Sequence, residues 1–256
     1  MNEIKGLTIE EEKILAEIDK SVIPRHIAII MDGNGRYAER LGQERILGHI
    51  AGVETVRRVS LACEELGVEV LTLYTFSAEN WARSEKEVTG LMTLIEEQLR
   101  VETEELHRKN VKIVHLGRME RLPKSTQDVL NESMEITKNN TKMVMQFAIN
   151  YSGRNEIVDA AKKLAEEVKS GKLAVEEIDE EIFSKNMYNP AVPDPDLVIR
   201  TAGEMRVSNY LLWEIAYSEF WITDTLWPEF DRLTLLKAIK DYQSRTRKFG
   251  AVVKEK

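Results

Sequence analysis

The chain of 256 residues contains one cysteine, Cys63, and no apolar run that approaches the length of a membrane span. A single cysteine excludes an internal disulfide, which is consistent with a reducing compartment. Because Cys63 lies in a helical pattern, we interpret it as a small buried apolar residue. A signal peptide needs a basic start and an apolar centre, and the acidic N-terminal segment has neither. We therefore expect a cytoplasmic protein.

The chain also lacks an excess of basic residues. It has 36 Lys and Arg against 44 Asp and Glu, a formal net charge of −8. Proteins that bind nucleic acid do so largely through basic contacts to phosphate groups. We therefore expect no nucleic-acid partner, and any basic site has to be a local cluster on an acidic background.

Several common catalytic motifs are missing. The sequence has no G-x-x-x-x-G-K-[ST] phosphate loop, no H-E-x-x-H helix and no two adjacent aspartates. Its four histidines are too scattered to suggest a zinc site. These absences exclude the common nucleotide-phosphate loop and the common zinc-hydrolase helix.

Short β-branched runs alternate with helical patterns along the chain. The expected strands are residues 26–32, 68–76, 111–117, 142–150, 196–203 and 219–224. The expected helices are residues 49–65, 85–110, 124–137, 155–169, 208–217 and 233–249. This alternation predicts an α/β fold, a single domain with a mostly parallel central sheet of about six strands flanked by helices.

Residues before and after the alternating strands and helices define the expected domain limits. Apolar residues in the segment 1–22 have the spacing of an amphipathic helix, which we expect to dock onto the domain. We assign residues 23–250 to one catalytic domain because no composition break or internal repeat interrupts them. The remaining residues, 251–256, form a tail.

The first expected strand ends in a bare carboxylate, Asp32, followed by Gly33, Asn34, Gly35 and Arg36. Ligands bind at the carboxyl ends of strands in open α/β sheets, where glycines let the backbone approach an anion. A carboxylate beside an anion site repels the ligand unless a cation bridges the two. The stretch therefore suggests a diphosphate that is held partly through Mg²⁺.

Other strand ends carry further arginines. The loops near these ends contain Arg36, Arg45, Arg83, Arg200 and Arg206. One surface arginine means little, but five in such loops of an acidic protein indicate one or two polyphosphate groups. His49 follows Arg45 by one helical turn and shares its face, so it either faces the phosphates or is a structural histidine.

Two other readings of this first loop remain. Gly33, Gly35 and Ala38 fit the G-x-G-x-x-A pattern of a dinucleotide-binding oxidoreductase, although the second strand that should carry a ribose-binding acid is replaced by a helical pattern. An aspartyl-nucleophile phosphotransferase would also place Asp32 at a strand end, but Asn34 stands where a second carboxylate is expected.

Three long stretches resemble the cis-prenyltransferases, and among them the bacterial undecaprenyl diphosphate synthases. They are HIAIIMDGNGRYAERLGQERILGHIAGVE, TLYTFSAENWARS and DLVIRTAGEMRVSNYLLWEIAYSEFWITDTLWPEF. The resemblance implies Mg²⁺-dependent, sequential cis-condensation of isopentenyl diphosphate onto an allylic diphosphate such as farnesyl diphosphate. The implied product is a polyprenyl diphosphate, by default the undecaprenyl carrier of cell-wall synthesis.

The resemblance also implies roles for individual residues. Asp32 corresponds to the family's essential metal-binding carboxylate, Asn80 to the residue that relays a proton, and Glu219 to a second metal-linked carboxylate. The residues that would bind the two diphosphate substrates are Gly33, Asn34, Gly35, Arg36, Tyr37, Arg45, His49, Ser77, Ala78, Glu79, Trp81, Arg83, Arg200, Arg206, Val207 and Ser208. Tyr37 and Ala202 stand where the family commonly has Trp and Gly, and Ala202 lies in a loop that we expect to use a positive φ.

For the apolar stripe of the expected helix 85–110, the resemblance implies a second function besides core packing. Val88, Leu91, Met92, Ile95 and Leu99 have the spacing of ordinary core, and they would also line a hydrophobic tunnel between sheet and helices. The family is homodimeric, and transient membrane contact would accompany product release. The rival functions are a short-chain cis-prenyl diphosphate synthase and a non-catalytic subunit that binds diphosphate lipids.

Overall fold

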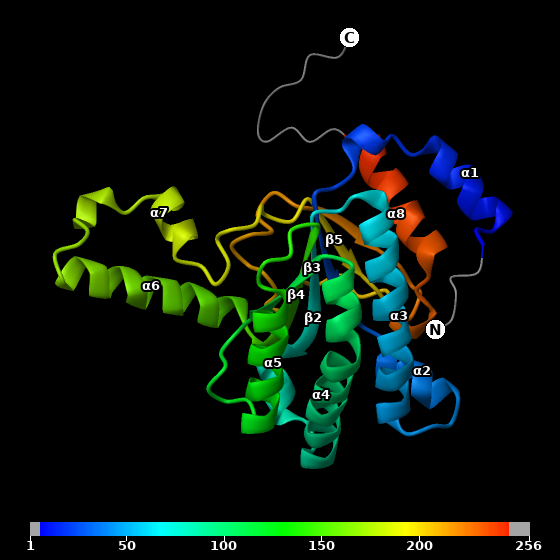
Figure 1. The fold of residues 1–256 in the computed structure, drawn as a ribbon, viewed down its shortest axis with the longest axis horizontal. Helices are drawn as coiled ribbons and strands as arrows, with labels where there is room; N and C mark the ends of the chain where they lie inside the picture. The colour runs from blue at the N-terminus through cyan, green and yellow to red at the C-terminus, as the bar shows by residue number, and fades with distance from the viewer. Residues whose placement is uncertain (1–5, 246–256) are drawn as a thin grey trace, which may run out of the picture.

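Six short strands form one all-parallel sheet in the computed structural model, which describes residues 6–245 (Figure 1). The strands are β1 (His26–Ile30), β2 (Val70–Ser77), β3 (Val111–Leu116), β4 (Met143–Tyr151), β5 (Leu197–Arg200) and β6 (Glu219–Ile222). Their order across the sheet is β3-β4-β2-β1-β5-β6. The order reverses beside β1, so the crevice for a ligand lies at the carboxyl end of β1.

The described residues also form eight α-helices: α1 (Ile9–Glu17), α2 (Asn34–Arg40), α3 (Arg45–Leu66), α4 (Glu85–Arg108), α5 (Lys124–Thr137), α6 (Gly153–Lys169), α7 (Glu180–Lys185) and α8 (Arg232–Ser244). Side chains cap several of them. Ser84, Ser152 and Asp231 accept backbone N–H groups in the first turns of α4, α6 and α8. These local signals explain why most helices begin close to the positions that the sequence predicts.

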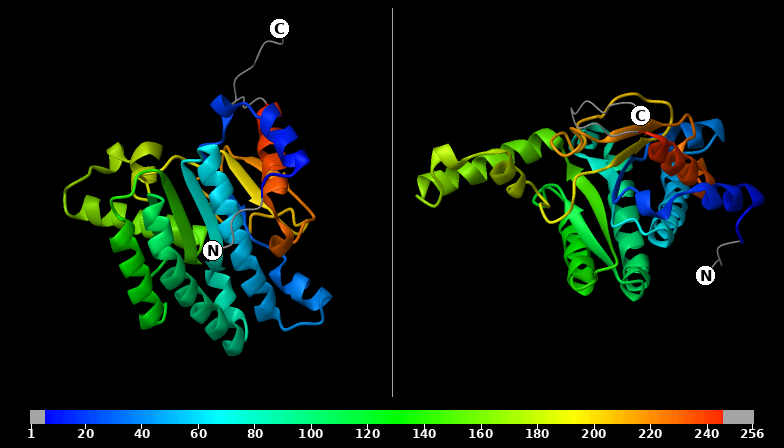
Figure 2. Two further views of the ribbon diagram at one scale, coloured as in Figure 1. Left: turned by 45° about the vertical axis from the view of Figure 1, so that its right-hand side comes forward. Right: turned by 90° about the horizontal axis from the view of Figure 1, so that it is seen from above.

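The side chains of β1 alternate between two cores. Ile27 and Ile29 join the larger core with residues of α3 and α8, whereas Ala28 and Ile30 face the opposite side of the sheet. The views agree that α3, α4 and α5 lie side by side along one face, and that α6 and α7 extend away from the sheet (Figure 2). The helices α3 and α4 therefore pack beside each other against the same face of the sheet.

One predicted helix, residues 208–217, is wrong. The segment is a series of turns that covers the second face of the sheet through Tyr210, Leu211 and Ile215. Ser208, Asn209 and Leu211 have φ values of 48°, 62° and 44°, which no right-handed helix tolerates. Asn209 is held by tertiary bonds, since its carbonyl accepts from Gly153 N at 2.8 Å.

The N-terminal helix α1 covers only residues 9–17 of the predicted segment 1–22, and it packs on the domain. Ile14 and Ile18 are buried in the larger core, and Glu10 of α1 pairs with Lys237 of α8 at 2.9 Å. No helix in residues 6–245 combines the length and apolar character that crossing a membrane requires. The limits proposed at residues 22 and 250 stay predictions, and the tail 251–256 lies outside the described residues.

Candidate active site

The backbone around Asp32 is fixed by three hydrogen bonds at the end of β1. The Asp32 carbonyl accepts from Thr201 Oγ1 at 2.6 Å and from Trp227 N at 3.0 Å. Gly33 N donates to Asp32 Oδ1 at 2.8 Å. Gly33 has φ 104°, a conformation that strains any residue with a Cβ atom. The turn is thus built to hold the carboxylate in one orientation.

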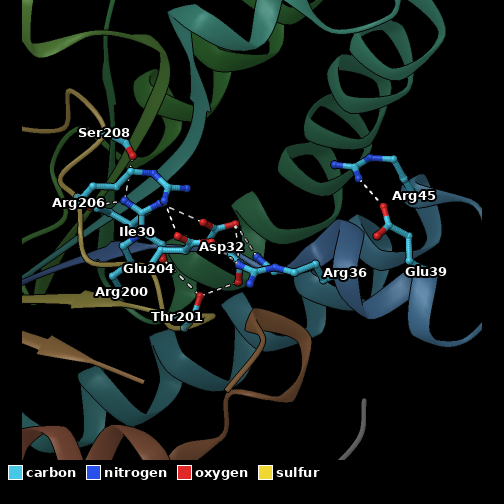
Figure 3. A network of polar contacts seen from close by, with 11 residues as sticks. Ile30, Asp32, Arg36, Glu39, Arg45, Arg200, Thr201, Glu204, Arg206 and Ser208 are labelled. Carbon is cyan, nitrogen blue, oxygen red and sulfur yellow. Dashed lines mark hydrogen bonds and ion pairs between the residues drawn. The ribbon is translucent and has the colours of Figure 1, made fainter. Parts of the chain in front are cut away.

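Arg200 is the main partner of this carboxylate. Its Nη2 donates to Asp32 Oδ2 at 3.0 Å, and its Nη1 donates to Ser208 Oγ at 2.8 Å and to the Arg206 carbonyl (Figure 3). The Arg200 side chain is 4% exposed and that of Asp32 is 33% exposed. The buried guanidinium thus fixes the partly exposed Asp32 carboxylate by a charge-assisted hydrogen bond.

Arg36 approaches the same carboxylate from α2. Its Nη2 lies 3.8 Å from Asp32 Oδ1 and 3.4 Å from Glu204 Oε1. Figure 3 shows Arg36 and Arg200 reaching Asp32 from different elements, with Arg206 and Glu204 close by. Because the Arg36 side chain is 46% exposed, it can turn from these carboxylates toward a ligand.

Asp32 and Arg200 line a pocket of about 570 Å³ at the carboxyl edge of the sheet, whereas Arg36 does not line it. The predicted site residues that line it are Asp32, Ser77, Glu79, Asn80, Arg83, Arg200, Arg206 and Ser208. Tyr74 and Asn209 also line it, and the sequence interpretation missed both. Tyr74 lies on β2 like a core aromatic, so only its position beside the strand end could have identified it.

The loop after β2 positions Asn80 by local bonds. Asn80 Oδ1 accepts from Ser77 N at 3.1 Å in the short helix Ala78–Ala82. Asn209 Nδ2 donates to Glu79 Oε1 at 2.7 Å and ties this loop to the segment after β5. Residues of both loops thus line the pocket.

A second polar cluster centres on Glu87, a residue that the sequence interpretation did not select. Glu87 Oε1 accepts from Arg83 Nη1 at 2.9 Å, and it lies 3.8 Å from Arg45 Nε and 4.0 Å from His49 Nε2. Burial, reinforced by the charge of Arg83, lowers the pKa of His49 to about 4. His49 is therefore a neutral imidazole at pH 7, able to share a hydrogen bond without adding charge.

Asn34 connects this cluster to α2. Its Nδ2 lies 3.4 Å from His49 Nδ1, while Asn34 Oδ1 and His49 Nε2 are buried without a hydrogen-bond partner. Gly48 makes the approach of the two helices feasible, because a Cβ there would lie 1.9 Å from the Asn34 carbonyl oxygen. Buried polar atoms without partners are uncommon, and they mark a place where a ligand can bind.

Other predicted site residues point elsewhere. Trp81 Nε1 donates to Asn150 Oδ1 at 2.8 Å, and its ring packs edge-on against Phe76. Arg45 pairs with Glu39 at 2.7 Å, apart from the Asp32 group (Figure 3). Val207 packs on the second core. The predicted substrate-binding residues that do not line the pocket at the strand end are Gly33, Asn34, Gly35, Arg36, Tyr37, Arg45, His49, Ala78, Trp81 and Val207.

Glu219 does not join Asp32 within the chain. It is the first residue of β6, in register with Leu197 at the start of β5, whereas Asp32 follows the end of β1. Ile27 of β1 is also in register with Leu197, so Asp32 lies five residues, or roughly 16 Å at about 3.3 Å per residue, farther along the strand direction than Glu219. Glu219 Oε2 accepts from Arg245 Nη1 at 2.9 Å instead. The two carboxylates of one chain cannot hold the same ion.

An apolar cavity of about 140 Å³ lies between α3, α4 and the sheet. Its walls include Leu91, Ile95 and Leu99 of the predicted stripe, together with Val56 of α3 and Phe147 of β4. Asn34 and His49 line one end of it. The cavity therefore begins at the polar cluster and follows the two helices away from it.

The donors around Asp32 fit a magnesium ion better than a zinc or calcium ion. Among residues 6–245 no group of three or more His, Cys, Asp and Glu side chains is arranged to hold a metal. Mg²⁺ commonly binds through one or two carboxylates and takes its remaining ligands from phosphate oxygens and water. Asp32, 33% exposed beside the pocket of about 570 Å³, suits that role.

Comparison with known proteins agrees with this geometry. Residues 30–250 match the family model described as putative undecaprenyl diphosphate synthase. An isoprenyl transferase of Clostridium perfringens is 48% identical over 97% of both chains, and one of Bacillus thuringiensis is 47% identical over 94% of this chain and 93% of its own.

Two solved structures share the fold. The lavandulyl diphosphate synthase from Lavandula x intermedia, in complex with dimethylallyl diphosphate, has a TM-score of 0.88 and 35% identity, covering 90% of this chain and 99% of its own. A probable undecaprenyl diphosphate synthase from Campylobacter jejuni has a TM-score of 0.75 and 30% identity, covering 89% and 98%. The oxidoreductase hypothesis is thereby wrong, as is the aspartyl-nucleophile hypothesis. The chain belongs to the undecaprenyl diphosphate synthase family and is a cis-prenyltransferase.

Proposed function

We propose that the protein catalyses Mg²⁺-dependent, sequential cis-condensation of isopentenyl diphosphate onto farnesyl diphosphate, giving a long polyprenyl diphosphate of undecaprenyl length. One observation carries the proposal. The anion-binding crevice at Asp32 and Arg200 lies next to an apolar cavity that follows α3 and α4. A substrate with a charged head and a hydrocarbon tail fits this pair of surfaces.

The two diphosphates would occupy different parts of the polar surface. Asn34 and Arg36, on α2 beside the cavity, would hold the allylic diphosphate, whose tail then enters the cavity. Arg200, Arg206 and Ser208 would hold isopentenyl diphosphate on the other side of Asp32. This arrangement puts the two reacting carbons side by side, which lowers the entropic cost of the condensation.

Asp32 would hold Mg²⁺ together with diphosphate oxygens and water. When bound, the ion would neutralise the charge that develops on the departing diphosphate. The guanidinium of Arg200 already holds the Asp32 carboxylate in place, so little reorganisation of that carboxylate is needed when the C–O bond breaks. Electrostatic stabilisation thus supplies most of the proposed catalysis.

Loss of a proton from the isopentenyl unit completes each condensation. Asn80 is fixed by its bond from Ser77 N and lines the pocket, so its amide can orient the group that takes the proton. An amide is itself a poor base. A diphosphate oxygen or a water molecule held by Asn80 is the better proton acceptor.

The cellular setting belongs to the same proposal. The composition supports a cytoplasmic enzyme whose product then passes to a membrane for use in cell-wall synthesis. The family resemblance supports a homodimer. In that assembly Glu219, which lies far from Asp32 of its own chain, would act in the role of a second metal-linked carboxylate only through a partner subunit.

The test is incubation of the purified protein with farnesyl diphosphate, labelled isopentenyl diphosphate and Mg²⁺, with and without a chelator. A long, chelator-sensitive product supports the proposal. No incorporation with any allylic primer contradicts it and favours the non-catalytic binding subunit. Incorporation that is unchanged by chelator removes Mg²⁺ from the mechanism.

A short-chain cis product is the second candidate. The similarity to the lavandulyl diphosphate synthase and the modest cavity of about 140 Å³ favour it. Chromatographic sizing of the same reaction separates the two candidates. A product that ends after one condensation supports the short-chain synthase and retains the chemistry.

A further inference from the structure

Two polar clusters bracket the apolar cavity between α3 and α4. The first is the Glu87 cluster beside Asn34 and His49. The second is an ion pair between Arg57 Nη2 of α3 and Glu102 Oε1 of α4, and both of these residues line the cavity. Arg57 Nη1 also donates to Glu54 Oε2 at 2.7 Å. The other lining residues are mostly apolar, with Ser60, Thr75 and Gln98 as polar exceptions.

The ion pair lies in the half of the cavity that is remote from the proposed diphosphate site, and Ser60 and Leu106 line the cavity one helical turn farther on. Eight residues separate His49 from Arg57 along α3, a rise of about 12 Å at 1.5 Å per residue. Gly90 of α4 approaches Ile46 of α3 near the first cluster, and a Cβ there would lie 3.3 Å from Ile46 Cδ1. The two helices are thus in contact near one end of the cavity and bridged by charge toward the other.

The cavity is too small for a long hydrocarbon. A space of about 140 Å³ resembles an engineered apolar cavity of roughly 150 Å³ that holds one benzene molecule. A chain of many isoprene units can enter only if α3 and α4 move apart. The Arg57–Glu102 ion pair joins the two helices, and it therefore opposes the separation that chain growth requires.

We propose that the Arg57–Glu102 ion pair is a specificity-determining latch that limits the length of the product. The inference rests on the proposed function and deepens it. When the tip of the growing chain reaches this pair, further growth has to separate the two charges or leave them facing hydrocarbon, and either is unfavourable. The side chains are 42% and 23% exposed, so water can receive them when the helices part.

The test replaces both charges with flexible apolar side chains in Arg57→Met/Glu102→Met. We expect the product distribution to move upward by about one isoprene unit or more, because the remote half now offers apolar surface to the chain. The rate of the first condensation should stay within a few-fold of that of the unmodified enzyme. Labelled products are sized by chromatography after dephosphorylation.

A matched control breaks a different bridge between two helices. Lys237→Met/Glu10→Met removes the 2.9 Å pair between α8 and α1, and neither residue lines the cavity. This control should leave product length unchanged. An equal shift in the control, or no shift in the Arg57 and Glu102 variant, overturns the latch.

A milder variant guards against misfolding. Glu102→Gln keeps the shape of the side chain and removes its charge, and it should lengthen the products by a smaller amount. Circular dichroism and thermal unfolding verify that each variant is folded. If the unmodified enzyme condenses the substrates but Glu102→Gln and the double variant make products of the same length as it does, the latch is refuted and the proposed function stands. If the unmodified enzyme incorporates no isopentenyl diphosphate, the proposed function is refuted.

Discussion

The two surfaces that meet beside Asn34 are built in opposite ways. The pocket at the strand ends is lined by charged and amide groups, and Asp32 is held there by Arg200 and by bonds to its own backbone. The neighbouring cavity is lined mainly by aliphatic and aromatic side chains, with the Arg57–Glu102 ion pair among them. A change in the pocket should therefore alter turnover, and a change in the cavity should alter stability and product length.

Replacement of the central carboxylate should give the largest effect. For Asp32→Asn we expect the fold to persist and kcat to fall by about 10³-fold or more, a loss of about 4 kcal/mol in transition-state stabilisation. Steady-state kinetics with saturating Mg²⁺ measures it. Asp128→Asn, at a 58% exposed side chain on α5, is the control. Activity of Asp32→Asn within tenfold of the unmodified enzyme would remove Asp32 from the mechanism.

Truncation of a side chain in the cavity wall should lower stability and leave turnover nearly unchanged, the opposite of the effect of Asp32→Asn. Leu99 is 6% exposed, so Leu99→Ala should lower the free energy of unfolding by about 2–5 kcal/mol while the first condensation keeps most of its rate. Chemical denaturation and single-condensation kinetics measure the two quantities. Val101→Ala on the same helix, at 65% exposure, should change stability by less than about 0.5 kcal/mol. Equal effects from both variants would argue against a packed wall.

Replacement of Arg206 in the pocket should have a smaller kinetic effect than replacement of Asp32. Its side chain is 59% exposed, so Arg206→Ala should leave stability unchanged and raise the KM for isopentenyl diphosphate by about tenfold. The KM for the allylic substrate should change much less. Arg108→Ala, at a 70% exposed side chain on α4, is the control. An unchanged KM for isopentenyl diphosphate would exclude Arg206 from that site.

A buried carboxyl pair outside both surfaces predicts a smaller, pH-dependent effect. Burial and the neighbouring Glu156 raise the pKa of Glu214 to about 8. The native state then binds a proton that the unfolded chain has released, so stability is full below about pH 4.5 and is lost as the pH rises toward 8. Glu214→Gln should raise Tm by roughly 2–4 °C at pH 8.5 and have little effect at pH 4.5. Parallel melting curves at both pH values would disprove the shift.

The smallest effect should come from the loop after β5. Ala202 has φ 69°, which confirms the expected positive φ and strains a residue with a Cβ atom. Ala202→Gly should stabilise the protein by about 0.5–1 kcal/mol without changing turnover, as denaturation at fixed pH would measure. A loss of stability would show that the Ala202 methyl group contributes more through packing than its backbone costs.

The sequence predicts the pocket better than the cavity for physical reasons. Asp32, Arg200 and Arg206 follow apolar strands, and a parallel sheet brings such positions to one edge. Leu91, Ile95 and Leu99 have the spacing of any core helix, so only the shape of the folded chain reveals the space beside them. Glu87 also escaped notice, because an acid on a helix of an acidic protein carries no signal of its own.

The sheet was predictable for a similar reason. Six β-branched runs separated by helical patterns specify a parallel α/β sheet, and all six are strands in the structure. The helix predicted for residues 208–217 was wrong because the apolar residues of this segment contact the sheet from turns with positive φ. Glu219 was assigned by motif, and the distance between the two edges of one sheet is not visible in a motif.

A single product-resolved time course tests the separation of the two surfaces most directly. It would compare the unmodified enzyme, Asp32→Asn and Arg57→Met/Glu102→Met with farnesyl diphosphate, labelled isopentenyl diphosphate and Mg²⁺. We expect Asp32→Asn to slow every condensation without changing the final length, and the double variant to lengthen the product with a near-normal first step. Loss of rate in both variants with no change in length would contradict the account.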